Sequence, residues 1–114
     1  MSEITLAISC DGEMVSSHFG RCEKYLIFKI RGGEVIEKEE ILNPGHQPGF
    51  LPQFLKQKSV NVLIAGGAGP RAQELLQNLG IEFILGISGE VNEVLTAYLN
   101  GELKPGQSQC EHER

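Results

Sequence analysis

The sequence predicts an α/β domain built on one mixed sheet of five strands that is covered on both faces. Three observations predict it. Short apolar runs of strand length alternate with segments in which apolar residues recur at helical spacing. Glycine and proline stand at most of the junctions between them. The chain has 114 residues, of which 40% are hydrophobic, so one domain can bury a core without disulfides or a structural metal.

The first half of the chain is expected to supply three strands. Residues 4–9 are apolar on both faces, which suits a central strand covered on both sides. Residues 25–30 form a second apolar run, and the Gly32-Gly33 turn leads from it into residues 35–42. The charged middle of this third segment suits an exposed edge. These two strands should therefore form a hairpin at one edge of the sheet.

The second half is expected to alternate helices and strands. A short helix follows the break at residues 43–45, and residues 60–65 form a buried strand. The clearest helix opens on Pro70 and ends at Gly80. Residues 81–85 form the fifth strand, and Ser88 is placed to cap a last helix. The helical positions are Phe50, Leu51, Phe54 and Leu55, then Ala72, Leu75, Leu76 and Leu79, then Val91, Val94, Leu95 and Tyr98, with Gly101 closing the last helix.

This succession of elements predicts the order of the strands. If strands one, four and five are parallel and joined by right-handed helical crossovers, the hairpin places strand two antiparallel beside strand one. The predicted order is 3-2-1-4-5. In such a sheet ligands bind beyond the carboxyl ends of the parallel strands, where the winding direction changes. That edge would collect residues 11–24, residues 43–46, the glycine turn after strand four and Ser88-Gly89.

Charge and organisation exclude several classes of partner. Fifteen acidic residues outnumber ten basic ones, and no run of lysine or arginine occurs, which argues against nucleic acid and anionic membranes. No apolar stretch is long enough to be a signal or to span a bilayer, so we expect a cytoplasmic protein. Residues 1–103 are predicted to form one domain, and residues 104–114 a polar, flexible tail with Cys110 and His112.

Cys10, His18 and Cys22 are the first candidates for metal ligands. At a strand end, Cys10 is equally typical of a small buried hydrophobe. His18 and Cys22 lie four residues apart in a loop where no helical pattern imposes that spacing, which favours a functional role. Three cysteines without a C-x-x-C pair argue against a closed zinc site. Second-rank candidates are His46 in a Pro/Gly-rich turn, and Cys110 and His112 in the tail.

The glycine turn has two interpretations. Residues 67–72 fit the pattern G-x-G-x-x-A between a strand and a helix, where backbone N–H groups and the helix dipole attract an anion. A dinucleotide site is disfavoured because no acidic residue ends strand five. A mononucleotide P-loop is not indicated, because the turn lacks a Walker-type lysine. The turn therefore leaves open a small regulatory domain that binds a phosphate-containing ligand at residues 67–69. A tight strand-to-helix turn explains the same glycines.

Four segments in order resemble the dinitrogenase iron-molybdenum cofactor biosynthesis family, the NifX-like domain. They are residues 16–22 (SSHFGRC), 43–45 (NPG), 64–72 (IAGGAGPRA) and 80–81 (GI), within a resemblance that covers residues 4–101. It implies a ribonuclease H-like three-layer α/β/α fold with a five-stranded mixed sheet. It also implies a role in binding or carrying metal-sulfur cofactor precursors, for nitrogenase in some members. It implies no catalysis.

We therefore expect a carrier for an iron-sulfur or iron-molybdenum-type cluster, held between the His18 loop and the glycine turn. Such a cargo needs only one or two labile ligands, and the thiolate of Cys22 or Cys10 with the His18 imidazole suits iron. Its partners would be the cluster and the proteins that donate or accept it. No enzyme is expected, because the edge offers no nucleophile with a paired base. The remaining cofactor-binding residues are expected to be Ser17, Arg21, Gly67, Gly69 and Arg71.

Overall fold

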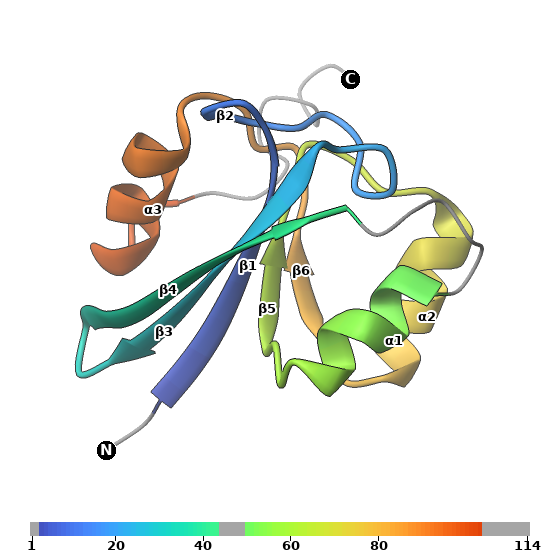
Figure 1. Cartoon of the computed structure of the whole chain (residues 1–114), viewed down its shortest axis with the longest axis horizontal. Coiled ribbons are helices and arrows are strands. Elements are labelled where there is room, and N and C mark those ends of the chain that lie inside the picture. Colours follow the sequence, from blue (N-terminus) through green and yellow to red (C-terminus); the bar gives the residue numbers. More distant parts are fainter. Residues whose placement is uncertain (1–2, 44–49, 104–114) are drawn as a thin grey trace.

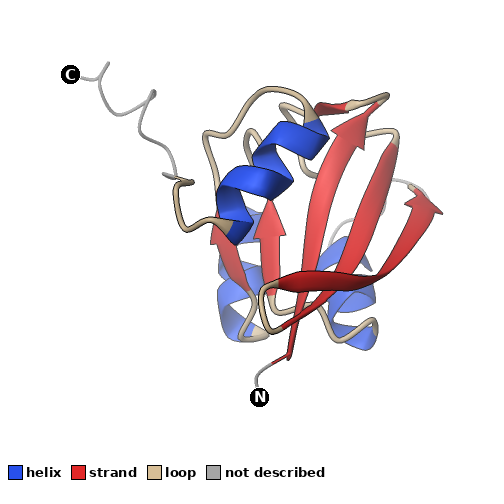
Figure 2. Ribbon diagram, turned by 90° about the vertical axis from the view of Figure 1, so that its left-hand side faces the viewer, coloured by secondary structure: helices blue, strands red, loops and turns tan. Residues whose placement is uncertain are grey.

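The computed structural model describes residues 3–43 and 50–103 and shows one mixed sheet between two layers of helices (Figure 1). Two helices cover one face and the third covers the other, as the turned view shows (Figure 2). Among the described residues no helix is long and apolar enough to cross a membrane. The elements are β1 (Glu3–Asp11), β2 (Met14–Val15), β3 (Lys24–Arg31), β4 (Glu34–Leu42), α1 (Phe50–Gln57), β5 (Val62–Ile64), α2 (Pro70–Asn78), β6 (Glu82–Ile84) and α3 (Val91–Leu99).

The order of the strands confirms the predicted topology. The sheet runs β4-β3-β1-β5-β6, which is the expected order 3-2-1-4-5. β3 is antiparallel to β1 and to β4, whereas β5 is parallel to β1 and to β6. The strand count of five was wrong, because the sheet has six strands. The extra strand, β2, pairs antiparallel with the end of β1, where Cys10 faces Val15 across a tight turn at Gly12 with φ of 63°. The signal for it was Asp11-Gly12, a dipeptide typical of hairpin turns.

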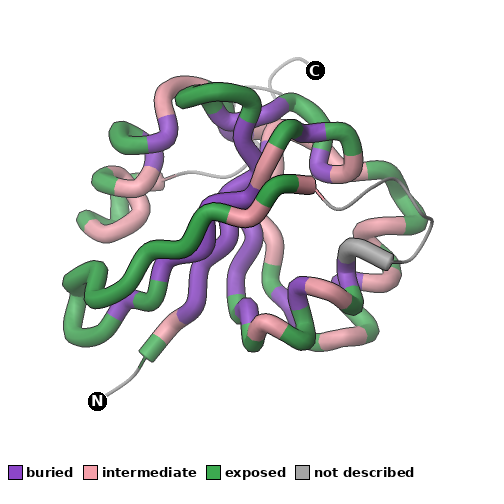
Figure 3. Tube along the Cα trace, in the orientation of Figure 1, coloured by how far each residue is buried: buried purple, intermediate pink, exposed green. Residues whose placement is uncertain are grey.

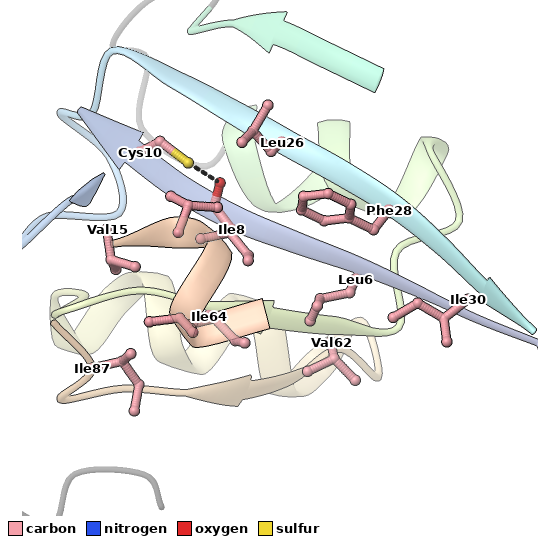
Figure 4. Packing of buried hydrophobic residues seen from close by; sticks show 12 residues of the cluster. Leu6, Ile8, Cys10, Val15, Leu26, Phe28, Ile30, Val62, Ile64 and Ile87 are labelled. Atoms are coloured by element: carbon pink, nitrogen blue, oxygen red, sulfur yellow. Dashed lines mark hydrogen bonds between the residues drawn. The ribbon is translucent and has the colours of Figure 1, made fainter. Parts of the chain in front are cut away.

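β1 forms the centre of the core, as predicted. Residues 5–9 of this strand are buried, and only Ile4 is half-buried (Figure 3). Leu6 and Ile8 pack toward α3 together with Val91 and Val94 (Figure 4). On the other face, strand residues pack against Leu55 of α1 and Leu76 of α2. The strand residues are Ala7, Ile27 and Leu63. Two apolar clusters on opposite faces of one sheet are what a strand without a polar face requires.

The other boundaries differ from the expected ones in detail. β4 is exposed from Glu34 to Glu40 and pairs with β3 alone, which confirms it as an edge strand. β5 and β6 are each three residues long and therefore shorter than expected. The cap expected of Ser88 is wrong, because Glu90 is the residue that precedes α3 and makes no side-chain cap. The first N–H group of α3, that of Val91, instead donates to the backbone carbonyl of Glu13 at 2.9 Å.

Candidate functional site

The segment between β1 and β3 (residues 12–23, the rim loop) lies along the carboxyl edge of the sheet. It is hydrogen-bonded on one side to the glycine turn after β5 (residues 65–69): Gly66 N donates to Ser16 O and Phe19 N donates to Gly67 O, both at 2.8 Å. On the other side Val15 N donates to Gly89 O at 2.9 Å. The expected meeting of the rim loop and the glycine turn is therefore confirmed.

Gly66 makes the close approach of the two segments possible. A Cβ atom on Gly66 would lie 2.7 Å from the Cα atom of Ser17 and 2.9 Å from the carbonyl oxygen of Ser16. Real side chains do not tolerate contacts this short with backbone atoms, so a hydrogen atom is required here. Gly69, by contrast, has nothing within 4 Å of its would-be Cβ.

The local conformation of the rim loop is set by Ser16. Its side chain is 1% exposed, and its hydroxyl accepts from His18 N and donates to His18 O, both at 3.1 Å. A serine that bonds to the backbone two residues ahead forms a local turn. This turn leaves Ser17 and His18 exposed at the tip. The two side chains are therefore available to a ligand.

The second part of the rim loop is held by Asn43, at the end of β4. The Asn43 side-chain amide donates to the carbonyls of Cys22 at 2.8 Å and Gly20 at 3.3 Å. Its backbone N–H donates to Glu23 O at 3.0 Å. These bonds place Arg21 between two anchored carbonyls with its side chain exposed.

Replacing Asn43 with alanine should lower the free energy of unfolding by about 1–2 kcal/mol, because two buried or half-buried carbonyls lose their donor. Urea denaturation of the purified protein measures this difference. Asn78→Ala, at an exposed position near the end of α2, is the control and should change stability by less than about 0.5 kcal/mol. An equal loss in both variants would contradict the anchoring role.

The two thiols lie beneath the rim and on opposite faces of the sheet. Cys10 is 0% exposed in the cluster that faces α3, and its Sγ donates to Ile8 O at 3.2 Å (Figure 4). Cys22 is 3% exposed in the cluster that faces α1 and α2, and its Sγ donates to Phe19 O at 3.5 Å. Burial raises the pKa of Cys10 to about 12 and also raises the pKa of Cys22. Both are therefore protonated at neutral pH.

The rim carries two arginines, Arg21 in the rim loop and Arg71 in the first turn of α2. Arg21 and Arg71 are exposed, and neither forms an ion pair with any described residue. The ion pairs of the described chain lie elsewhere and engage Lys24, Lys29, Arg31 and Lys58. α2 begins after Gly69 without a side-chain cap and without an acidic residue in its first turn. The positive end of its dipole is therefore uncompensated.

The glycine turn adds hydrogen-bond donors to this charge. Among the described residues, the N–H groups of Gly67, Ala68 and Gly69 donate no hydrogen bond. The carbonyls of Gly67 and Ala68 do have partners, the N–H of Phe19 and the side chain of Gln73. The turn is thus a set of donors that leads directly into the helix turn of Arg71 and is hydrogen-bonded to the loop that carries Arg21. It suits an anion.

Comparison with known proteins identifies the family of the chain. The family model described as dinitrogenase iron-molybdenum cofactor matches residues 3–101. The chain belongs to this family. A curated relative, the uncharacterized protein MJ0580 of Methanocaldococcus jannaschii, is 32% identical over 104 residues, which is 87% of this chain and 88% of that protein.

Solved structures show the same fold in other proteins. The crystal structure of PH0822 has a TM-score of 0.85 and 31% identity, covering 91% of this chain and 96% of that one. The solution structure of a candidate NifB protein from Thermotoga has a TM-score of 0.71 and 30% identity, covering 90% of this chain and 93% of that one. Both structural matches cover almost the whole of this chain, which is a member of the dinitrogenase iron-molybdenum cofactor family.

In this family member the structure brings together only part of the predicted site. The exposed residues of the rim loop and the glycine turn share one rim, but the thiols of Cys10 and Cys22 are covered. No three His, Cys, Asp or Glu side chains in residues 3–43 and 50–103 are placed to hold one metal ion. The metal-ligand assignments of Cys10, His18 and Cys22 stay predictions. Three further candidates lie outside the described residues: His46, Cys110 and His112.

Three residues that shape the site were not predicted from the sequence. Ser16 and Asn43 act through their side chains on backbone groups of the rim loop, and Tyr25 donates its hydroxyl to Phe19 O at 2.6 Å. A serine two residues before His18 and an asparagine before a proline are signals for local turns. Tyr25 had no such signal, because an aromatic residue in a buried strand is ordinary.

Proposed function

We propose that this protein binds and carries an anionic metal-sulfur cluster of the iron-sulfur or iron-molybdenum type, and that it performs no catalysis. The observation that carries the proposal is the rim itself. The N–H groups of its glycine turn have no partner among the described residues, and neither Arg21 in the adjoining loop nor Arg71 in the following helix forms an ion pair with a described residue. Membership of the dinitrogenase iron-molybdenum cofactor family supports this type of cargo.

The cargo would be held by few strong ligands. Bridging sulfides fill much of the coordination of each metal, so a carrier that must release its cargo needs one or two protein ligands. The exposed imidazole of His18 is the donor that is ready to bind without any rearrangement. The Ser17 hydroxyl and the guanidinium groups of Arg21 and Arg71 would supply hydrogen bonds to the sulfides.

The thiols rank after His18 in this proposal. A thiol must lose its proton to bind iron, and burial opposes that loss at both cysteines. Cys22 belongs to the rim loop, and its thiol donates to the Phe19 carbonyl of the same loop, so a shift of the loop would move the thiol with it. Cys10 belongs to β1 and lies in the core that faces α3. We therefore rank Cys22 second and Cys10 third.

The wider assignments of the sequence analysis belong to the same proposal. They are the ribonuclease H-like classification of the fold, a cytoplasmic location, and partner proteins that donate the cluster or accept it. The Thermotoga protein described as a NifB candidate supports a place in cofactor biosynthesis, since it shares the fold at 30% identity.

Anaerobic reconstitution with ferrous iron, sulfide and molybdate tests the proposal. Bound iron, molybdenum and sulfide are counted after desalting, for the wild type and for the double variant Arg21→Gln/Arg71→Gln. Affinity should fall at least about ten-fold in the variant, because it loses two charge-assisted hydrogen-bond donors. His18→Ala should also lower occupancy.

A second double variant tests whether the loss of cluster binding comes from the rim arginines or only from the change in net charge. Lys38→Gln/Lys56→Gln removes the same charge from β4 and α1 and should retain the wild-type occupancy. An equal loss in the two double variants would show that only overall charge matters. A wild-type protein that retains no metal and no sulfide would end the carrier proposal.

The free N–H groups of the glycine turn also favour a second candidate, a regulatory domain that binds a phosphate-containing ligand. This candidate predicts that the purified protein carries an ultraviolet-absorbing ligand and no metal. It also predicts that inorganic phosphate shifts the amide resonances of residues 67–69. Visible absorption together with metal in the purified protein would decide against it.

A further inference from the structure

The carbonyl oxygen of Phe19 is the point where the rim loop is attached to the core. It accepts a hydrogen bond from the Tyr25 hydroxyl at 2.6 Å and from the Cys22 thiol at 3.5 Å. The N–H group of the same residue donates to Gly67 O at 2.8 Å. One peptide segment thus joins β3, the rim loop and the glycine turn.

Tyr25 is built into the core and yet directs its polar atom at the loop. Its side chain is 0% exposed, and its ring lies 5.8 Å from the Phe19 ring at an interplanar angle of 59°. A phenylalanine would fill nearly the same volume without the need to satisfy a buried hydroxyl. What the hydroxyl adds is the bond to Phe19. Burial raises the pKa of Tyr25, so it remains a donor throughout the neutral range.

We propose that Tyr25 is the positioning residue of the rim: its hydroxyl, through the Phe19 carbonyl, holds the rim loop on the glycine turn and keeps Cys22 covered. When that bond opens, the loop can move and Cys22 becomes accessible. That Cys22 then serves as a second cluster ligand rests on the proposed function. That the Tyr25 hydroxyl holds the rim loop in place does not.

Native-state alkylation of the metal-free protein tests the hold. Wild type and Tyr25→Phe are treated with iodoacetamide under reducing-agent-free, anaerobic conditions, and labelling of each cysteine is followed by mass spectrometry. Labelling of Cys22 should become about three- to ten-fold faster in Tyr25→Phe, because one hydrogen bond less lowers the free energy of local opening. Labelling of Cys10, in β1, should not change.

Tyr98→Phe is the matched control. The chain has two tyrosines, and Tyr98 is half-buried in α3 on the other face of the sheet. This variant should label as the wild type does at Cys10 and Cys22. Amide hydrogen exchange gives a second readout: the Phe19 N–H should lose protection in Tyr25→Phe and keep it in Tyr98→Phe.

Each other outcome overturns the proposal. Unchanged Cys22 labelling in Tyr25→Phe would show that the hydroxyl does not hold the loop. Faster labelling of Cys10 and Cys22 together, as in a protein that has lost global stability or fails to fold, would show a merely structural role. Reconstitution of the wild type is scored separately, so a failed cluster assay with selective Cys22 exposure would reject the proposed function and leave the positioning role standing.

Discussion

Gly66→Ala is expected to lower the free energy of unfolding by about 2–3 kcal/mol and to separate the rim loop from the glycine turn. The added Cβ would lie 2.7 Å from Ser17 Cα, 2.9 Å from Ser16 O and 3.3 Å from Ile87 O. All three are backbone atoms, which cannot rotate aside as a flexible side chain would. The clash can be relieved only if the loop or the turn moves.

Urea denaturation and amide exchange check this result together. The N–H groups of Gly66 and Phe19, which donate across the junction, should lose protection in Gly66→Ala. Gly69→Ala is the control, because nothing lies within 4 Å of its would-be Cβ and its φ is −67°. It should cost about 1 kcal/mol or less, as expected for alanine at an N-cap. Equal losses in the two variants would refute the steric argument.

The stability of the fold is expected to decline above pH 9 because of Cys10. In the folded state the pKa of this thiol is raised to about 12 from 9.0 by burial. Below pH 9 both states hold the proton, so ionisation of the thiol has no effect on stability there. Above pH 9 the unfolded chain releases the proton while the folded chain keeps it. The resulting loss reaches roughly 3 kcal/mol by pH 11 and ends near the folded pKa.

Denaturation of the wild type and Cys10→Ala between pH 7 and pH 11, anaerobically, isolates this effect. The variant should be less stable at pH 7 because a buried side chain is shortened. Its stability should then decline less steeply above pH 9. Lysine deprotonation and the raised pKa values of Cys22 and Tyr25 act on both proteins and cancel in the difference. Parallel curves over the whole range would contradict the buried-thiol assignment.

Much of the fold could be predicted because its signals are local. The apolar run of β1, the charged edge strand β4 and the helix from Pro70 to Asn78 each follow from short-range pattern, and the handedness of crossovers then restricts the strand order. Two errors remain: the two-residue strand β2 was missed despite its local signal, and the cap of α3 was misplaced where distant segments meet. Ser88 is not the cap of α3, because the carbonyl of Glu13 already accepts from the first helical N–H.

The candidate site divides in the same way. The residue types in the rim loop and the glycine turn could be found from the sequence, because glycines before a helix and histidine or arginine in a loop are local signals. Which of these side chains are exposed to solvent could not be predicted from the sequence. His18 and Arg21 are exposed, whereas Cys22 in the same loop is 3% exposed.

By itself the sequence determined the main strands and helices, the order in which they pair and which loop and turn meet at the carboxyl edge, but not the short strand β2. Only the tertiary structure decided that the arginines of this rim have no ion pair with a described residue, that Cys10 and Cys22 are buried and that the Tyr25 hydroxyl donates to the Phe19 carbonyl. The reason is physical. Periodicity and turn chemistry act over a few residues, whereas burial, ion pairing and the partner of a buried hydroxyl depend on which distant atoms the folded chain places alongside.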